Sequence, residues 1–342
     1  MKFKNPYIIA EISANHCGSF ERAKKLIKCA KINGANAVKL QTYTADMMTI
    51  KSNKSYFKIK SGLWKGYNLW DLYNKAHTPL SWHPKLFSYA KKIGITLFST
   101  PFSEAAVDYL EKLNCPFYKV ASFEMIDHPL VIRIAKTKKP IIISTGMANL
   151  KEIETTVNIA KKNGAKKIIL LYCVSNYPSK ISDFNLANIE ILKKKFRCPV
   201  GLSDHSKGNL IAALSTSFGA EFFEKHIALD NQKKGVDIEF SAKGKEIKEY
   251  VRTINDSIKL IKKNSSYTNL SDKKMKLFRR SIFAIKNIKK GELLSNENIK
   301  RIRPGHGISP SYYDKLLGKK SPKKISYGEP IKIELIKKLN IK

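Results

Sequence analysis

The segment GLSDHSKGNLIAALSTSFGAEFFEKHIALD, residues 201–230, determines how the rest of this chain is interpreted. It contains two short strand-like runs, which end in His205 and His226, and an apolar helical segment between them. Consecutive parallel strands joined by a helix end side by side at one edge of a sheet, so both imidazoles are expected to face one point. Two converging imidazoles can hold a divalent metal such as Zn, Mn or Fe. The alternative is that each histidine is a hydrogen-bonded core residue.

The same alternation of strand and helix extends over most of the chain. Nearly continuous apolar runs, as in buried parallel strands, predict strands at 6–13, 36–42, 96–100, 117–122, 141–145, 167–174, 199–205 and 221–227. Helices are expected after Ser19, which can cap the first, and at 103–113, 129–137, 150–163, 185–196, 209–218 and 245–262. Eight such units predict a (β/α)8 TIM barrel with its active site at the carboxyl ends of the strands. A doubly wound open sheet is the alternative, but no Gly-x-Gly-x-x-Gly turn follows the first strand, which argues against a dinucleotide-binding fold.

Two regions depart from this repeat. The long insertion at 43–84 is rich in aromatic residues, and it is expected to be either a lid or substrate wall on the catalytic rim or a packed surface excursion. A polar, Ser- and Lys-rich stretch predicts a linker at 264–278, so the barrel is expected to span 1–263. Residues 279–342 contain short strand-like pieces and repeated turns, and predict a small second domain that packs on a barrel.

Composition narrows the class of protein. The 342 residues are 43% hydrophobic, which is enough for a large core, and no run of about 18 apolar residues predicts a membrane span. Five cysteines without Cys-x-x-Cys spacing, and an amino terminus unlike a signal peptide, predict reduced thiols in the cytoplasm. The net charge of +36 leaves nucleic-acid or membrane binding as one interpretation. The lysines recur in every segment, mostly as pairs on helical stretches. This distribution favours lysines spread over solvated helix faces, and it argues against a nucleic-acid or membrane partner.

Polar side chains end each expected strand. Lys39 and Lys119 belong to the second and fourth strands, and a buried lysine needs a negative partner. Hydroxyls follow the neighbouring strands, at Thr100, Ser122, Ser144 and Ser203. Together these groups predict a pocket for a small anion, such as a phosphate ester that also carries a carboxylate. The alternative is two buried salt bridges, for example Lys39 with Glu11 and Lys119 with Glu124.

Short motifs occur in order along the expected barrel: AEISANH (10–16), VKLQT (38–42), STPF (99–102), YKVASFE (118–124), STGM (144–147), YP (177–178), GLSDH (201–205) and EKH (224–226). They resemble the sialic acid synthase family, and RPGHGISP (303–310) resembles the antifreeze-like, or SAF, domain of that family. The segments most similar to the pseudaminate-forming branch are GLWKG (62–66), LWDLY (69–73), HTPLSWH (77–83) and EFS (239–241) after GVD (235–237). The N-acetylneuraminate and legionaminate branches are the close alternatives.

This resemblance implies a condensation of phosphoenolpyruvate with an acetamido sugar aldehyde, which releases a nine-carbon 2-keto acid and phosphate. For the pseudaminate branch the sugar is 2,4-diacetamido-2,4,6-trideoxy-altrose. The implied phosphoenolpyruvate contacts are Lys39, Thr100, Lys119, Ser122, Ser144, Ser175 and Ser203. Ser175 departs from the sialate enzymes, which carry an amide at that place.

The resemblance also implies that His205 and His226 bind a divalent metal, Mn, Mg or a similar ion, which polarises the aldehyde oxygen. The implied sugar contacts are Gln41, Tyr177 and Asp237. Either Glu11 or Glu124 is expected to take the proton of the attacking water. Arg303 is expected to reach the site from the small domain of a partner subunit, in a domain-swapped homodimer.

Overall fold

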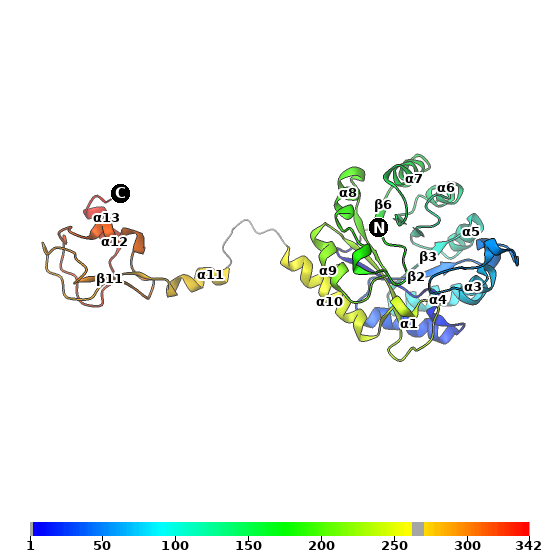
Figure 1. The fold of residues 1–342 in the computed structure, drawn as a ribbon, viewed down its shortest axis with the longest axis horizontal. Helices are drawn as coiled ribbons and strands as arrows, with labels where there is room; N and C mark the ends of the chain where they lie inside the picture. The colour runs from blue at the N-terminus through cyan, green and yellow to red at the C-terminus, as the bar shows by residue number, and fades with distance from the viewer. Residues whose placement is uncertain (1–2, 262–269, 342) are drawn as a thin grey trace. The chain divides into compact units, whose positions relative to one another are not determined.

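The computed structural model describes residues 3–261 and 270–341 and divides the chain into two compact units, Met1–Lys262 and Lys263–Lys342 (Figure 1). Of the predicted linker at 264–278, residues 264–269 lie outside the described residues. Its remainder forms helix α11, Leu270–Met275, and a 3-10 turn, Lys276–Phe278. Leucine, lysine and methionine are good helix formers, so this polar stretch supports a helical turn as well as a connection.

The first unit is a closed parallel barrel. Within the described residues its eight strands are β1 (Tyr7–Glu11), β2 (Ala37–Thr42), β3 (Thr96–Pro101), β4 (Tyr118–Val120), β5 (Ile141–Ser144), β6 (Ile168–Cys173), β7 (Val200–Asp204) and β8 (Phe222–Ala228). Each strand pairs in parallel with the next, and β8 pairs with β1 from Phe222 opposite Tyr7 to His226 opposite Glu11, which closes the sheet. The predicted (β/α)8 TIM barrel is therefore confirmed and the open sheet excluded. A short strand, β9 (Ala242–Lys243), pairs with the end of β8.

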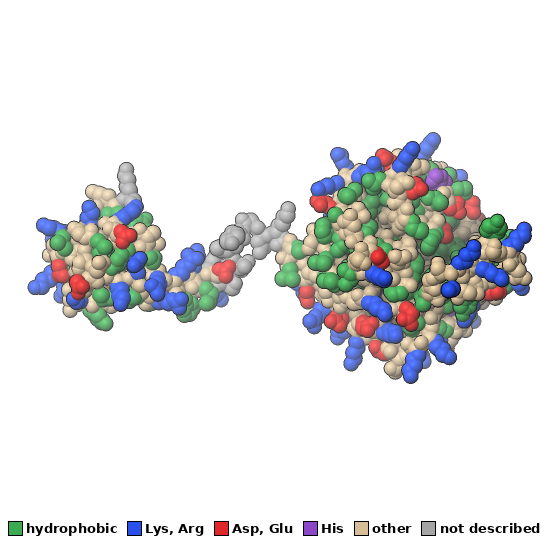
Figure 2. Space-filling view, viewed as in Figure 1, with side chains coloured by type: hydrophobic (Ala, Val, Ile, Leu, Met, Phe, Trp, Pro, Cys, Tyr) green, Lys and Arg blue, Asp and Glu red, His purple; other side chains and the backbone are tan. Residues whose placement is uncertain are grey.

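Helices surround the barrel (Figure 1). They are α1 (Phe20–Ile32), α4 (His83–Ile93), α5 (Glu104–Lys112), α6 (His128–Lys136), α7 (Leu150–Lys162), α8 (Ala187–Phe196), α9 (Leu210–Ser217) and α10 (Lys245–Leu260). Side chains of Ser19, Ser103 and Asn149 cap α1, α5 and α7. On the face shown in Figure 2, lysine and arginine side chains are spread around the barrel and do not form one patch, as solvated helix faces predict. No helix in the described residues has the length and apolar character needed to cross a membrane.

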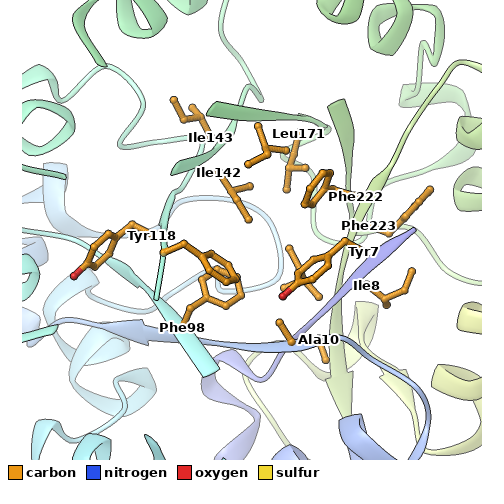
Figure 3. Packing of buried hydrophobic residues seen from close by; sticks show 14 of the residues in the cluster. Tyr7, Ile8, Ala10, Phe98, Tyr118, Ile142, Ile143, Leu171, Phe222 and Phe223 are labelled. Carbon is orange, nitrogen blue, oxygen red and sulfur yellow. The ribbon is translucent and has the colours of Figure 1, made fainter. Parts of the chain in front are cut away.

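The barrel interior is apolar at the amino-terminal ends of the strands. Tyr7 and Phe222 lie with ring centroids 5.6 Å apart, and Phe98 packs on Phe117 at 4.2 Å. Figure 3 shows Tyr7, Phe98 and Phe222 pointing toward one another inside the barrel. Side chains alternate along a strand, so each aromatic residue shares its face with the residue two positions later. Those residues include Thr100, Lys119 and Glu224. The barrel therefore carries a polar layer directly above an apolar plug.

The insertion between β2 and α4 is folded. It contains helix α2 (Ala45–Met48), a 3-10 turn (Ser55–Phe57) and helix α3 (Leu69–Ala76). Two buried contacts attach its end to the barrel: Thr78 Oγ1 lies 3.2 Å from His16 Nε2, and Thr42 Oγ1 lies 2.9 Å from His83 Nε2. Burial lowers the pKa of each of these histidines to about 4. The insertion is therefore held by imidazoles that are neutral at physiological pH.

The second unit has its own core. Strand β10 (Ser281–Ala284) pairs antiparallel with β11 (Ile299–Ile302), and helices α12 (Tyr313–Leu316) and α13 (Ile333–Lys338) follow. The buried side chains of this core include Ile282, Ile288, Leu294, Ile299 and Leu316. They form a cluster separate from the core of the barrel, as a small second domain requires.

Candidate active site

Two buried lysines and two buried carboxylates meet inside the barrel and form what we call the ion cluster: Glu11, Lys39, Lys119 and Glu224. Glu11 Oε2 lies 2.6 Å from Lys39 Nζ, and Glu224 lies 3.5 Å from both lysine nitrogens. The four side chains are at most 5% exposed. Glu224 was not among the expected site residues, and it replaces Glu124 as the carboxylate that pairs with Lys119. Of the two predicted salt bridges, the one between Lys39 and Glu11 is present, whereas the one between Lys119 and Glu124 is wrong.

Charge pairing and burial set the protonation states of the ion cluster. Burial alone would raise the pKa of Glu224, but Lys119 and Lys39 lower it to about 2. Burial alone would lower the pKa of Lys39, but the carboxylates of Glu11 and Glu224 raise it. Burial does lower the pKa of Lys119. Burial also raises the pKa of Glu11 to about 7 despite the nearby Lys39, so Glu11 is the member whose charge changes near neutral pH.

Hydroxyl groups surround the ion cluster. Three of them bind it directly: Lys39 Nζ donates to Thr100 Oγ1 at 3.1 Å, Lys119 Nζ donates to Ser144 Oγ at 2.7 Å, and Ser203 Oγ donates to Glu224 Oε1 at 3.1 Å. Ser122 and Ser175 flank Gly146, where an added Cβ would lie 2.9 and 2.4 Å from their Oγ atoms. The missing side chain at Gly146 therefore lets both hydroxyls approach the end of β5.

His205 and His226 lie side by side at the ends of β7 and β8, with ring centroids 5.4 Å apart. His205 Nδ1 lies 3.1 Å from the carbonyl oxygen of Val174, so Nδ1 carries a hydrogen and Nε2 is the nitrogen left for another partner. Burial alone would lower the pKa of His205, but the nearby Cys173 raises it. The Tyr177 ring packs on His205 at 4.5 Å, and the Phe240 ring packs on His226 at 4.8 Å. Burial lowers the pKa of His226 well below its usual value, which leaves this imidazole neutral, as a metal ligand must be.

The surroundings of the histidine pair fit a metal. His226 Nδ1 is buried, has no hydrogen-bond partner among the described residues, and lies 3.8 Å from Asp237 Oδ2. Ser13 Oγ donates to the same carboxylate oxygen and accepts from Gln41 Nε2 at 3.3 Å. No three His, Cys, Asp or Glu side chains gather as ligands within the described part of the chain. A metal on this pair would therefore take its remaining ligands from substrate or water, as catalytic sites do.

A cavity of about 420 Å³ opens beside the histidine pair. Its polar side chains include Ser13, Gln41, Glu124, Tyr177, His226 and Asp237. The folded insertion supplies much of the rest of its lining, including the phenols of Tyr43 and Tyr73. Glu124 Oε2 is buried without a partner among the described residues, and burial raises the pKa of this carboxyl to about 7. Trp64 Nε1 donates to the carbonyl oxygen of Val236 at 3.0 Å, which ties the insertion to the loop after β8. The insertion is therefore a wall of the cavity.

The expected site residues of the first unit lie on the carboxyl side of the barrel, and their individual roles stay predictions. Arg303 belongs to the second unit and directly follows β11. Glu224 had a sequence signal, because it lies two residues before His226 on one strand face. Its neighbour Lys225 faces outward and pairs with Asp204 at 3.1 Å. Ser13 had no such signal: it adopts a left-handed φ of 42° and reaches Asp237 only through the fold.

A (β/α)8 barrel that gathers buried lysines, carboxylates and imidazoles beside a cavity is typical of an enzyme acting on a small anionic substrate. Comparison with known protein families identifies the family of this chain. The NeuB family matches residues 26–266, and the SAF domain matches residues 279–337. The chain belongs to the NeuB family, which confirms the resemblance inferred from its motifs.

Individual relatives are similar over nearly the whole chain. The pseudaminic acid synthase of Campylobacter jejuni is 43% identical over 331 residues, which cover 96% of each protein. The pseudaminic acid synthase of Helicobacter pylori is 41% identical over 334 residues, covering 97% of this chain and 98% of that protein. The crystal structure of the N-acetylneuraminic acid synthetase of Leptospira borgpetersenii in complex with citrate is 32% identical. The similarity covers 80% of this chain and 90% of the Leptospira chain, with a TM-score of 0.71.

Proposed function

We propose that this chain condenses phosphoenolpyruvate with 2,4-diacetamido-2,4,6-trideoxy-altrose to give pseudaminic acid and phosphate. The observation that carries the proposal is the ion cluster, where two buried lysines are bound by surplus hydroxyls in a barrel of the NeuB family. The choice of sugar is supported by identities of 43% and 41% to pseudaminic acid synthases, against 32% to the neuraminate enzyme of known structure. N-acetylneuraminate and legionaminate synthesis are the alternatives within the family.

In this proposal the two lysines hold the phosphate and carboxylate of phosphoenolpyruvate, and hydroxyls complete the pocket. The hydroxyls belong to Thr100, Ser122, Ser144, Ser175 and Ser203. The aromatic plug beneath Lys119 closes the amino-terminal side, so the anion can enter only from the carboxyl side. Fixing the anion there directs carbon three of phosphoenolpyruvate toward the cavity, where the sugar binds.

His205 and His226 would hold a divalent metal such as Mn or Mg, which when bound polarises the aldehyde oxygen of the sugar. The Val174 carbonyl fixes the His205 ring so that Nε2 is available. Gln41, Tyr177 and Asp237 are assigned to the sugar, and the first and last of these are already linked through a shared hydrogen bond network.

Carbon three of phosphoenolpyruvate forms a bond to the aldehyde carbon as the aldehyde π bond breaks, so that the aldehyde oxygen takes up a proton and positive charge develops at carbon two. Water adds at carbon two and gives up a proton. The bond between carbon two and the phosphate oxygen then breaks as the carbon-two hydroxyl loses its proton, which leaves the keto group and phosphate. Overall the two protons of the water go to the aldehyde oxygen and to phosphate. We assign the proton that the attacking water gives up to Glu124, because its free oxygen lines the cavity and its pKa is about 7. Glu11 also has a pKa of about 7, but Lys39 occupies its carboxylate at 2.6 Å.

Arg303 is proposed to contact the substrate from the small domain of a second copy, in a domain-swapped homodimer. The SAF domain match over residues 279–337 includes this arginine. An Arg303→Ala substitution mixed with a Lys119→Met chain tests it, because swapping would restore one complete site in each mixed dimer.

The test of the proposed function is release of phosphate from phosphoenolpyruvate in the presence of each of the three candidate sugars. Release is expected with the diacetamido trideoxy sugar, and it should stop with a chelator and return with Mn. Lys119→Met is expected to lower kcat/KM by about a thousandfold or more, since it removes a charge that holds the anion. Lys225→Met is the matched control, because Lys225 is an equally buried lysine that pairs with Asp204 outside the ion cluster. Phosphate release independent of every sugar would refute the proposal.

A further inference from the structure

The cavity beside the histidine pair has two chemically different sides. Its polar side holds carboxyl, amide, phenol and imidazole groups, whereas the insertion contributes aliphatic side chains that we call the aliphatic wall. The aliphatic wall consists of Met48, Ile59, Leu69, Leu72 and Ala76. None of these side chains carries a hydrogen-bonding oxygen or nitrogen, so the wall can contact methyl and methylene groups but cannot satisfy a hydroxyl.

The polar groups that the insertion brings to the cavity are the ring N–H of Trp64 and the phenols of Tyr43 and Tyr73, which differ in kind from the aliphatic side chains. Trp64 lines the cavity, and its ring N–H already donates to the carbonyl oxygen of Val236 at 3.0 Å. Tyr73 lines the cavity, and burial, followed by the nearby Glu124, raises the pKa of its phenol, which therefore stays uncharged. A hydroxylated substrate pressed against the aliphatic wall would lose water hydrogen bonds without replacement.

The wall is also fixed in place. The Trp64 hydrogen bond joins it to the loop after β8, and the Trp64 ring lies 5.5 Å from the Tyr177 ring. Asp46 accepts from Trp70 Nε1 at 2.9 Å, which links α2 to α3 inside the insertion. A surface held at both ends cannot easily move to make room for a differently shaped or more polar ligand.

We infer that the aliphatic wall is the specificity element of this enzyme, and that it selects sugars with a deoxygenated carbon and acylamido methyl groups over sugars with free hydroxyls. This inference rests on the proposed function, and it assigns the discrimination to side chains of the insertion. An apolar surface of this kind discriminates between a methyl and a hydroxyl by about tenfold to a hundredfold in kcat/KM.

The experiment uses the full chain with Mn and phosphoenolpyruvate and measures kcat/KM for two sugars. One is 2,4-diacetamido-2,4,6-trideoxy-altrose, and the other is N-acetylmannosamine, which has one acetamido group and free hydroxyls. Met48→Gln keeps the side-chain length but places an amide on the wall. It should lower the ratio of the two kcat/KM values by about tenfold, with the KM for phosphoenolpyruvate unchanged.

Two matched variants accompany it. Met47→Gln makes the same change on the neighbouring residue of α2, which does not line the cavity, and should leave the ratio as in wild type. Met48→Leu keeps the wall apolar and should also preserve the ratio. A Met48→Gln ratio equal to that of Met47→Gln would overturn the inference while leaving the proposed function standing. Failure of the wild type to use any acetamido sugar would refute the proposed function, and this inference with it.

Discussion

Replacing Glu224 by glutamine tests the ion cluster most directly. The substitution keeps the shape of the side chain but removes the carboxylate that lies 3.5 Å from both Lys39 and Lys119. Glu11 then remains as the one carboxylate of the cluster, and it is closest to Lys39. Lys119 would be left buried with the hydroxyl of Ser144 and no opposite charge within the cluster. We therefore expect a less stable barrel.

The size of the loss follows from the pKa of Glu224, which the two lysines lower from the usual 4.5 to about 2. At about 1.4 kcal/mol per pH unit, this difference corresponds to about 3 kcal/mol of stability at neutral pH. Breaking a buried ion pair costs about 3–5 kcal/mol in general, which agrees. Because the folded pKa lies below the unfolded one, this stability is present above pH 4.5 and is lost as the pH falls toward 2.

The same change should strengthen the binding of anions. If phosphoenolpyruvate binds the two lysines as proposed, Glu224 competes with it for their charges. Removal of Glu224 is then expected to lower the Kd of phosphoenolpyruvate while the free protein becomes less stable. Urea unfolding measures the stability of the free protein, and calorimetric titration measures the Kd of phosphoenolpyruvate. Asp204→Asn is the matched control, since it breaks the buried pair with Lys225 on the outer face of the strands. The control should lose stability without any change in Kd.

Two results would refute this reasoning. If Glu224→Gln unfolds at the same urea concentration as wild type, then Glu224 is not the counter-ion of the lysines. If the variant loses stability but its Kd for phosphoenolpyruvate matches that of Asp204→Asn, the anion does not bind between Lys39 and Lys119.

Two further predictions concern pH. Activity should rise with pH through about 7 as Glu124 loses its proton, and Glu124→Gln should abolish this limb of the kcat profile, whereas an unchanged limb would assign it to another group. The contribution of His16 and His83 to the free energy of unfolding should fall as the pH drops from 6.5 to about 4, because the unfolded state then binds protons that these buried histidines do not. The difference corresponds to at most about 3 kcal/mol per histidine. His83→Gln should flatten this dependence in urea unfolding curves, and an equally steep curve would contradict the assignment.

The barrel was predictable because its strands are buried on both faces. The runs at 141–145 and 167–174 are apolar almost throughout, and β5 and β6 lie within them as Ile141–Ser144 and Ile168–Cys173. The insertion at 43–84 could not be predicted in the same way. Its helices α2 and α3 are short, and they are held by tertiary contacts such as that between Trp70 and Asp46. Local periodicity carries little information about such segments.

The sequence identified the two buried lysines of the candidate site but not their pairings, and it did not identify Glu224 or Ser13 as site residues. Lys39 and Lys119 could be identified from the sequence, because lysine is unusual in a buried strand. The partner of Lys119 was misjudged, since Glu124 is near in sequence but Glu224 comes from the far side of the closed barrel, on β8. Alternation of side chains along β8 would have placed Glu224 and His226 inside the barrel and Lys225 outside it. Closure of the sheet, which no local pattern encodes, decides which inward charges meet.

The charges of the ion cluster indicate that its two lysines alone offer little net positive charge to a multiply charged anion. Glu224 stays ionised with a pKa of about 2, and Glu11, with a pKa of about 7, carries part of a second negative charge at neutral pH. The cluster is therefore close to neutral before substrate enters. In the proposed function, a divalent cation held by His205 and His226 would supply further positive charge for a phosphate ester with a carboxylate. Binding of the anion and of the metal should then favour each other, with the lysines fixing position and the metal supplying much of the affinity.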